Sequence, residues 1–150
     1  IFVLLAASRF IPHPPNFTSL IALSFYVPAI FGRKYIFAVI LCFFITDIFI
    51  GFHSVTLFTW GSVILIGLSS RFFLSSMFTR LSGSLLGACI FFLITNFGVW
   101  SMGSYGYTVE GFILCYTLAL PFFAYSLIST FIFASVIEGI IKFKFLHIKI

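Results

Sequence analysis

Apolar runs separated by short polar segments make up almost the whole chain. The runs cover residues 1–11, 17–31, 35–52, 55–68, 83–100 and 111–141. A helix needs about 20 apolar residues to cross a bilayer, so the run over 1–11 is too short to span. We therefore expect either that residues upstream are missing or that the first helix is truncated. The pattern as a whole predicts about six transmembrane helices.

Two boundaries within this pattern make specific predictions. His53–Ser54 separates two runs of helical length, so 35–52 and 55–68 are predicted to form a helical hairpin. The last run is too long for one crossing and contains Pro121, which has no backbone N–H. We therefore predict a short interfacial helix over 111–120 and a sixth span over 122–141.

Composition assigns the chain to the bilayer. Hydrophobic residues make up 62% of the chain and charged residues 7%, which leaves too little polar surface to cover the core of a soluble domain. The predicted fold class is an all-α membrane protein, with residues 1–150 in a single transmembrane domain. The net charge of +5 does not indicate nucleic-acid binding, because the basic residues are sparse and flank apolar runs.

Basic residues collect on one side of this predicted layout. With alternate crossings, seven of the eight Lys and Arg residues fall on the same face: Arg33, Lys34, Arg71, Arg80, Lys142, Lys144 and Lys149. The positive-inside rule makes that face cytoplasmic. Both termini are therefore predicted to lie in the cytoplasm.

The outward half receives most of the polar residues that could bind a solute. The predicted substrate-binding residues are Arg9, His13, Asn16, Asp47, His53, Asn96 and Trp100. His13 lies between prolines, which hold it on a stiff, extended connector. Asp47 is a carboxylate within a membrane helix, so we expect it to face the bundle interior with Arg9 or His13 as its partner.

The same residues also have ordinary structural interpretations. Arg9 could anchor a helix end at the headgroups, and Asp47 could serve only a structural ion pair. His53 could simply end a helix in the interface. Asn96 could join neighbouring helices, and Trp100 could belong to an aromatic belt.

The sequence favours neither catalysis nor a resident cofactor. It holds no nucleophile elbow, no HExxH motif and no phosphate-binding glycine loop, so we expect no enzyme activity. His13, Asp47 and His53 are residue types that bind metals, but no local spacing supports a metal site. We predict no metal ion and no other cofactor. A metal-ion transporter, and an enzyme that uses His13 and Asp47 for proton transfer, are lesser alternatives.

Three further features concern packing. Gly83 and Gly87 form one GxxxG pattern, which permits close approach of helices. Glu138 precedes Lys142 by four residues and is predicted to pair with it. The cysteines stand singly inside apolar runs, as reduced and buried thiols do: Cys42, Cys89 and Cys115.

Several blocks of the sequence resemble a family of small, uncharacterised bacterial inner-membrane proteins. The blocks are RFIPHPPNFT at residues 9–18, TDIFIGFH at 46–53, SLLG at 84–87, FLITNFGVW at 92–100, CY at 115–116 and PFF at 121–123. The similarity covers almost the whole chain, and it departs from the family's pattern at Ser19, Tyr125 and Ser129–Thr130. It implies a multi-pass protein of the bacterial inner (cytoplasmic) membrane.

That family in turn resembles the substrate-binding S components of energy-coupling factor (ECF) vitamin transporters. This second resemblance implies six helices, an outward-facing ligand pocket, and an energising transmembrane partner that works with ATPases. Ala6 and Ala7 are the candidate counterparts of the small residues by which S components dock that partner. We therefore predict a substrate-binding component for the uptake of a vitamin-like small molecule, embedded in the lipid bilayer and without a nucleic-acid partner.

The main alternative is a structural or scaffold subunit of a larger membrane complex. In that case the polar cluster would only hold helices together. A cavity in the outer half that contains the polar side chains favours transport. A filled outer half with a large exposed apolar flank favours the scaffold.

Overall fold

The computed structural model describes residues 2–147 and consists of six α-helices with two short 3₁₀ turns. The elements are α1 (Phe2–Phe10), α2 (Leu20–Phe31), η1 (Arg33–Tyr35), α3 (Ile36–Ile50), α4 (Thr56–Ser69), η2 (Ser70–Phe73), α5 (Met77–Ser101) and α6 (Val109–His147). The side chains of Ala6 and Lys144, and the whole of Lys149, lie outside the described residues. The predicted all-α class is confirmed, and the described residues form six α-helices. Of the six predicted membrane crossings, only three correspond to described segments long and apolar enough to span a bilayer, as described below.

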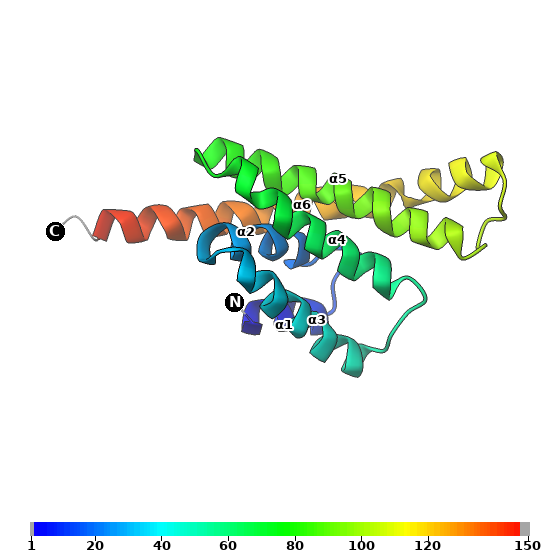
Figure 1. Cartoon of the computed structure of the whole chain (residues 1–150), viewed down its shortest axis with the longest axis horizontal. Coiled ribbons are helices and arrows are strands. Elements are labelled where there is room, and N and C mark those ends of the chain that lie inside the picture. The colour runs from blue at the N-terminus through cyan, green and yellow to red at the C-terminus, as the bar shows by residue number, and fades with distance from the viewer. Residues whose placement is uncertain (1, 148–150) are drawn as a thin grey trace.

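The two longest helices, α5 and α6, run side by side along the long axis of the molecule (Figure 1). Helix α4 packs on α5, and α2 contacts α4, α5 and α6. Helices α3 and α4 contact each other across the turn at residues 51–55, which confirms the predicted hairpin. Helix α1 is short and packs on α3. The N-terminal third of the chain therefore lies against one side of the long α5–α6 pair.

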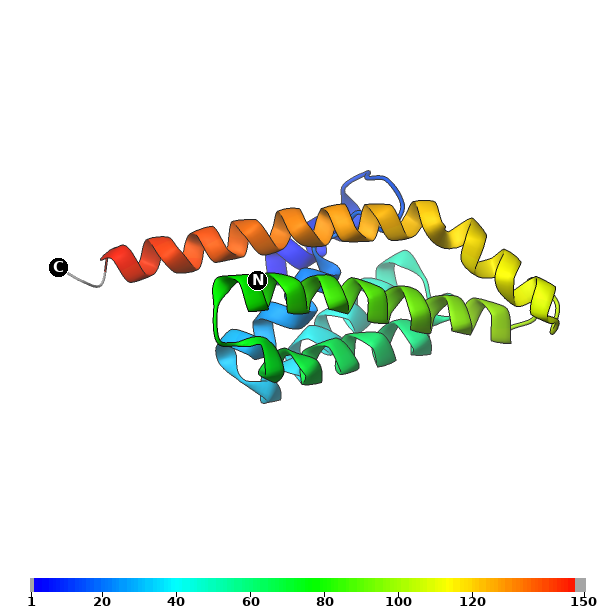
Figure 2. The ribbon, with the colours of Figure 1, turned by 90° about the horizontal axis from the view of Figure 1, so that it is seen from above.

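Helix α6 corrects the prediction that Pro121 divides the last apolar run. It is continuous over 39 residues with Pro121 inside it. Figure 2 shows that α6 bends in the part that contains Pro121, where its colour passes from orange to yellow. A proline removes one backbone hydrogen bond, and it bends a helix without ending it when neighbouring elements pack against both halves. Here α5 packs along α6. At about 1.5 Å per residue, α6 is about 59 Å long and exceeds the bilayer core of about 30 Å.

Three segments of the described chain are long and apolar enough to cross a membrane: Thr56–Phe73, Met77–Ser101 and Val109–Phe143. Helix α2 is a shorter apolar helix of 12 residues. At about 1.5 Å per residue α2 reaches only about 18 Å, well below the roughly 30 Å of a bilayer core. The length and composition of the long helices fit a membrane protein.

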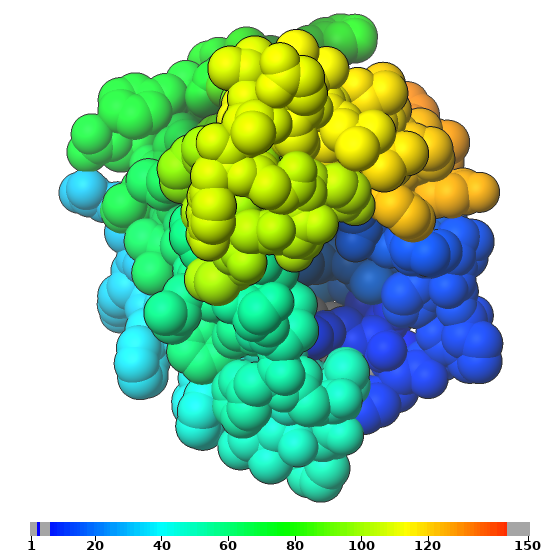
Figure 3. Space-filling model, turned by 90° about the vertical axis from the view of Figure 1, so that its right-hand side faces the viewer, coloured from blue at the N-terminus to red at the C-terminus, as the bar shows by residue number. Residues whose placement is uncertain are grey.

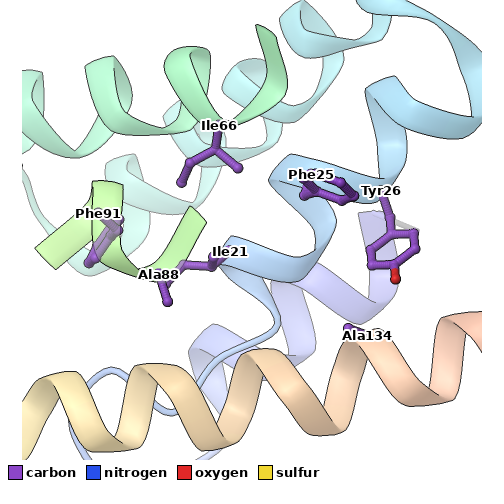
Figure 4. Close-up of a cluster of buried hydrophobic side chains, with 7 residues drawn as sticks. All are labelled: Ile21, Phe25, Tyr26, Ile66, Ala88, Phe91 and Ala134. Atoms are coloured by element: carbon purple, nitrogen blue, oxygen red, sulfur yellow. The ribbon is translucent and has the colours of Figure 1, made fainter. Parts of the chain in front are cut away.

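Helix α2 forms the centre of the core. Eight consecutive residues from Ile21 to Pro28 are buried, so the helix is covered on every side. A helix that is apolar all round belongs in an interior, and the sequence of α2 is apolar all round. Figure 4 shows one of the clusters that surround it: Ile21, Phe25, Tyr26, Ile66, Ala88, Phe91 and Ala134.

The GxxxG pattern lies where α5 meets this core. A Cβ atom added at Gly83 would lie 2.6 Å from Cγ of Phe73 and 2.7 Å from Cε2 of Phe25. At Gly87 it would lie 3.1 Å from Cγ2 of Ile66. The prediction of close packing through these glycines is confirmed, and Gly83 is the tighter contact.

Gly83→Ala is therefore expected to destabilise the fold. Two aromatic rings would have to move, and overpacking of this kind costs about 1–3 kcal/mol. Gly61→Ala on α4 is the matched control, because nothing lies within 4 Å of its added Cβ. It should be neutral or slightly stabilising, since Ala favours helix over Gly. Unfolding of both purified variants by SDS titration measures the difference, and equal stability would contradict the expectation.

Five basic residues lie at one end of the bundle, which we call the basic end. They are Arg33 and Lys34 in η1, Arg71 in η2, Arg80 near the start of α5, and Lys142 near the end of α6. The α2–α3 and α4–α5 turns and the last part of α6 share the left-hand side of Figure 1. The predicted gathering of basic residues is confirmed for these five.

Candidate functional site

An ion pair between α1 and α3 forms the most polar point of the N-terminal half. Arg9 Nη2 lies 2.6 Å from Asp47 Oδ1, and Arg9 Nη1 donates to Thr46 Oγ1. The guanidinium carbon lies 4.9 Å from the ring centroid of Phe43, within the range of a cation–π contact. Asp47 is only 1% exposed. A carboxylate in an apolar helix was expected to need a partner, and that partner is Arg9.

Trp60 completes the shell around Asp47. Its Nε1 donates to Asp47 Oδ2 at 2.9 Å, so both carboxylate oxygens accept hydrogen bonds. Trp60 is not among the predicted site residues, so the sequence prediction missed this contact. A signal was present, because Asp47 precedes His53 by six residues and Trp60 follows Ser54 by six. Residues equally far from a hairpin turn lie at the same level of the two helices.

Beside this ion pair lies an open cavity of about 250 Å³, which we call the Arg9 pocket. Its lining comes from the α1–α2 connector and from α1 to α5: Arg9, His13, Asn16, Thr18, Leu20, Phe43, Ile50, His53, Thr59 and Phe91. Figure 3 shows a hollow between the blue N-terminal segment and the teal end of the α3–α4 hairpin, on the side away from the basic end. The polar groups of the lining and its apolar wall suit an amphipathic small molecule.

Both histidines of the pocket use Nδ1 for a local hydrogen bond. His13 Nδ1 donates to the carbonyl oxygen of Pro14 at 2.7 Å. His53 Nδ1 lies 2.7 Å from Thr56 Oγ1, and that hydroxyl donates to the His53 carbonyl oxygen at 2.7 Å. The Thr56 hydroxyl has only one hydrogen, so His53 Nδ1 is the donor to it. Nε2 is then the ring nitrogen that each histidine can present to a bound molecule.

The connector that carries His13 is held in place at Asn16. Asn16 has a φ of 62°, a left-handed conformation that asparagine adopts more readily than most residues. The Ser129 hydroxyl on α6 lies 3.4 Å from the Asn16 carbonyl oxygen and 3.2 Å from the Ser126 carbonyl oxygen, so its one hydrogen is shared between these two acceptors. Ser8 and Ser19 are also joined through their hydroxyls at 2.8 Å, across the two ends of the connector. The stiff segment predicted from its prolines is therefore attached to α6 as well as to α1 and α2.

The structure brings together five of the seven predicted site residues. Arg9, His13, Asn16 and His53 line the Arg9 pocket, whereas Asp47 lies behind Arg9 and outside the lining. Asn96 and Trp100 do not line the pocket. The Asn96 side chain donates to the Phe92 carbonyl oxygen of its own helix at 2.7 Å. Pocket residues that the sequence prediction missed are Thr18, Leu20, Phe43, Ile50, Thr59 and Phe91.

Trp100 belongs to an aromatic cluster between α5 and α6. Its ring contacts Phe97, Tyr107 and Phe112, with ring centroids 5.4–6.4 Å apart. Its Nε1 is buried without a hydrogen-bond partner among the described residues. The surroundings of Trp100 are thus largely aromatic, and the residue packs the α5–α6 pair.

The described residues contain no group of three or more His, Cys, Asp or Glu side chains arranged to hold a metal ion. His13, Asp47 and His53 therefore do not form a three-ligand site. Asp47 is bonded to Arg9 and Trp60, whereas His13 Nδ1 is bonded to the Pro14 carbonyl oxygen. The arrangement is an open cavity next to a buried ion pair.

A second polar network lies near the basic end and corrects the predicted partner of Glu138. Glu138 on α6 pairs with Arg80 on α5, with Nε–Oε1 at 2.6 Å and Nη2–Oε2 at 2.7 Å. Tyr26 on α2 donates its hydroxyl to Oε1 at 2.8 Å. Lys142 instead lines an adjacent cavity of about 310 Å³, together with Met77, Arg80, Glu138 and Ile141. We call the three bonded residues the Glu138 network.

The structure is an all-helical protein with three segments long and apolar enough to cross a membrane and a small cavity lined in part by polar side chains. The chain belongs to DUF6580, a family of unknown function, which matches residues 1–148. Comparison with curated proteins found no match, and comparison with solved structures found none either.

Proposed function

We propose that this chain is a membrane transport protein that binds a small solute in the Arg9 pocket, as the substrate-binding component of an uptake system. The pocket is the observation that carries this proposal. Four polar side chains from two separate parts of the sequence share one open cavity in a largely apolar chain: Arg9, His13 and Asn16 from the first, and His53 from the second. A bundle whose polar residues served only as interhelical contacts would fill this space with packed side chains.

The size of the pocket supports a small molecule. Its volume of about 250 Å³ lies just below the range of about 300–1,000 Å³ that is usual for drug-sized ligands. A vitamin-like solute or a smaller organic molecule fits such a space. The apolar side chains of Leu20, Phe43, Ile50 and Phe91 would cover its body, while the polar groups fix its orientation.

The charge distribution supports an orientation for this function. The basic end carries Arg33, Lys34, Arg71, Arg80 and Lys142, so the positive-inside rule favours a cytoplasmic position for it. The Arg9 pocket then opens away from the cytoplasm, as solute capture requires. Release inward needs a further step. We propose an energising transmembrane partner with ATPases for that step, as the resemblance to ECF S components implies, and the bacterial inner membrane as the location.

Thr59→Phe is expected to abolish solute binding. Thr59 lines the pocket and is 8% exposed, so a phenyl ring at this position would occupy part of the cavity. The measurement is thermal unfolding of the purified full chain in detergent, with a panel of vitamins, organic acids, amines and metal ions. We expect at least one panel member to stabilise the wild type, by about 2.7 kcal/mol at a hundredfold excess over Kd. The variant should lose this stabilisation.

Leu57→Phe provides the matched control for this experiment. Leu57 lies on the same helix and is 78% exposed, so its replacement leaves the pocket unchanged. The control variant should keep the full stabilisation by the solute. A wild type that no panel member stabilises, or equal stabilisation of the wild type and Thr59→Phe, would contradict the proposal. That outcome would favour the alternative of a scaffold subunit.

A further inference from the structure

We propose that the Arg9 pocket selects a small organic anion, with one carboxylate group and an apolar body. This inference rests on the proposed function and adds the chemical class of the solute. The argument starts from the polar groups of the lining. They are one guanidinium, two imidazoles, one carboxamide and two hydroxyls, from Arg9, His13, His53, Asn16, Thr18 and Thr59. None of these groups is a carboxylate.

None of the acidic residues of the chain lines the pocket. The chain has only three acids. Asp47 is ion-paired with Arg9 and bonded to Trp60, and Glu138 is bonded within its own network near the basic end. Glu110 is exposed in the first turn of α6 and does not line the pocket. A cationic solute would therefore find no carboxylate in the lining of the pocket to offset its loss of hydration.

The ion pair presents its positive end to the pocket. Arg9 lines the cavity and its side chain is 16% exposed, whereas the Asp47 side chain is 2% exposed and does not line it. The bonds from Arg9 to Asp47 and Thr46 use two of the five N–H donors of a guanidinium. These bonds also hold the group in one orientation before any solute arrives. A fixed guanidinium binds a carboxylate with less entropic cost than a mobile one.

The apolar part of the lining completes the description of the solute. Phe43 and Phe91 are buried ring residues from α3 and α5, and Leu20 and Ile50 add aliphatic surface. An inorganic anion would leave this surface without a partner. A carboxylate on a short aliphatic or aromatic body would use both halves of the site.

Three probes of one shape and different charge test this inference: benzoate, benzamide and benzylamine. Their affinities for the purified full chain are to be measured by thermal unfolding followed through tryptophan fluorescence. We expect benzoate to bind about tenfold tighter than benzamide, because a hydrogen bond to an ionised group is about twice as strong as a neutral one. Benzylamine should bind more weakly than benzamide.

The double variant Arg9→Gln/Asp47→Asn removes both charges without leaving one of them buried and unpaired. It should bind benzoate and benzamide about equally. Lys142→Gln, near the basic end, is the control and should keep the preference for benzoate. Three results would overturn the anion assignment. The first is tighter binding of benzamide or benzylamine than of benzoate, and the second is an unchanged preference for benzoate in the double variant. The third is no binding of any probe to the folded wild type. If neutral or cationic solutes stabilise the wild type but not Thr59→Phe, solute binding in this pocket stands and only the anion assignment falls.

Discussion

Glu138→Ala is expected to cost about 3–5 kcal/mol of stability, the range found when one partner of a buried ion pair is removed. Glu138 is 3% exposed, and its loss would leave the guanidinium of Arg80 and the hydroxyl of Tyr26 without their acceptor. Because the three residues come from α5, α2 and α6, the change would loosen three helices at once. SDS titration or thermal unfolding of the purified variant provides the measurement.

Two further variants separate the ion pair from simple loss of a side chain. Glu110→Ala removes an exposed acid at the other end of α6 and should cost much less stability than Glu138→Ala, because only the favourable position of an acid in the first turn of the helix is lost. The double variant Glu138→Ala/Arg80→Ala should lose much less stability than the two single variants lose together, because it contains no unpaired guanidinium. Additive costs, or a Glu138→Ala variant as stable as Glu110→Ala, would contradict the expected coupling.

Asp47→Ala is expected to be the second most damaging change. It would leave Arg9 without its counterion and the indole N–H of Trp60 without an acceptor, at a cost of about 3 kcal/mol or more. Helix α1 has only nine residues and packs on α3, so the loss should free α1 and the connector first. Hydrogen–deuterium exchange of residues 7–19 measures this local release, together with the global unfolding midpoint.

The compensated variant Arg9→Gln/Asp47→Asn should be considerably more stable than Asp47→Ala. It keeps neutral groups of similar shape on both sides of the contact, so no buried charge is left alone. The connector should then exchange almost as slowly as in the wild type. A compensated variant that is as unstable as Asp47→Ala would show that the charges themselves hold α1 in place.

The parts of the fold that were predictable are those that depend on apolar length and on single buried charges. The α3–α4 hairpin followed from two apolar runs joined at His53–Ser54. The Arg9–Asp47 pair followed from the cost of a carboxylate in an apolar helix and the few residues able to offset it. In the first case the length of the apolar runs decides the structure, and in the second the cost of a buried carboxylate decides it. Neither prediction requires knowledge of how the other helices pack.

The errors came from local rules that packing overrides. Pro121 usually marks a helix boundary, yet α6 continues through it because α5 supports both halves. The i+4 rule paired Glu138 with Lys142, whereas Arg80 reaches it from 58 residues away with a two-pronged contact that lysine lacks. Asn96 bonds to its own helix, an option that a polar residue in an apolar helix always has. These contacts cannot be predicted from the spacing of residues along the sequence alone.

The burial of α2 has a consequence for how the protein is made. A helix of 12 residues is too short to be selected as a crossing by its own length, and its eight central residues have no surface left for lipid. Its neighbours α4, α5 and α6 all follow it in the chain and leave the ribosome later. We therefore expect the N-terminal third to remain unpacked near the insertion machinery until α6 has been synthesised. Assembly of the bundle would then proceed from its C-terminal half toward its N-terminal half, opposite to the direction of translation.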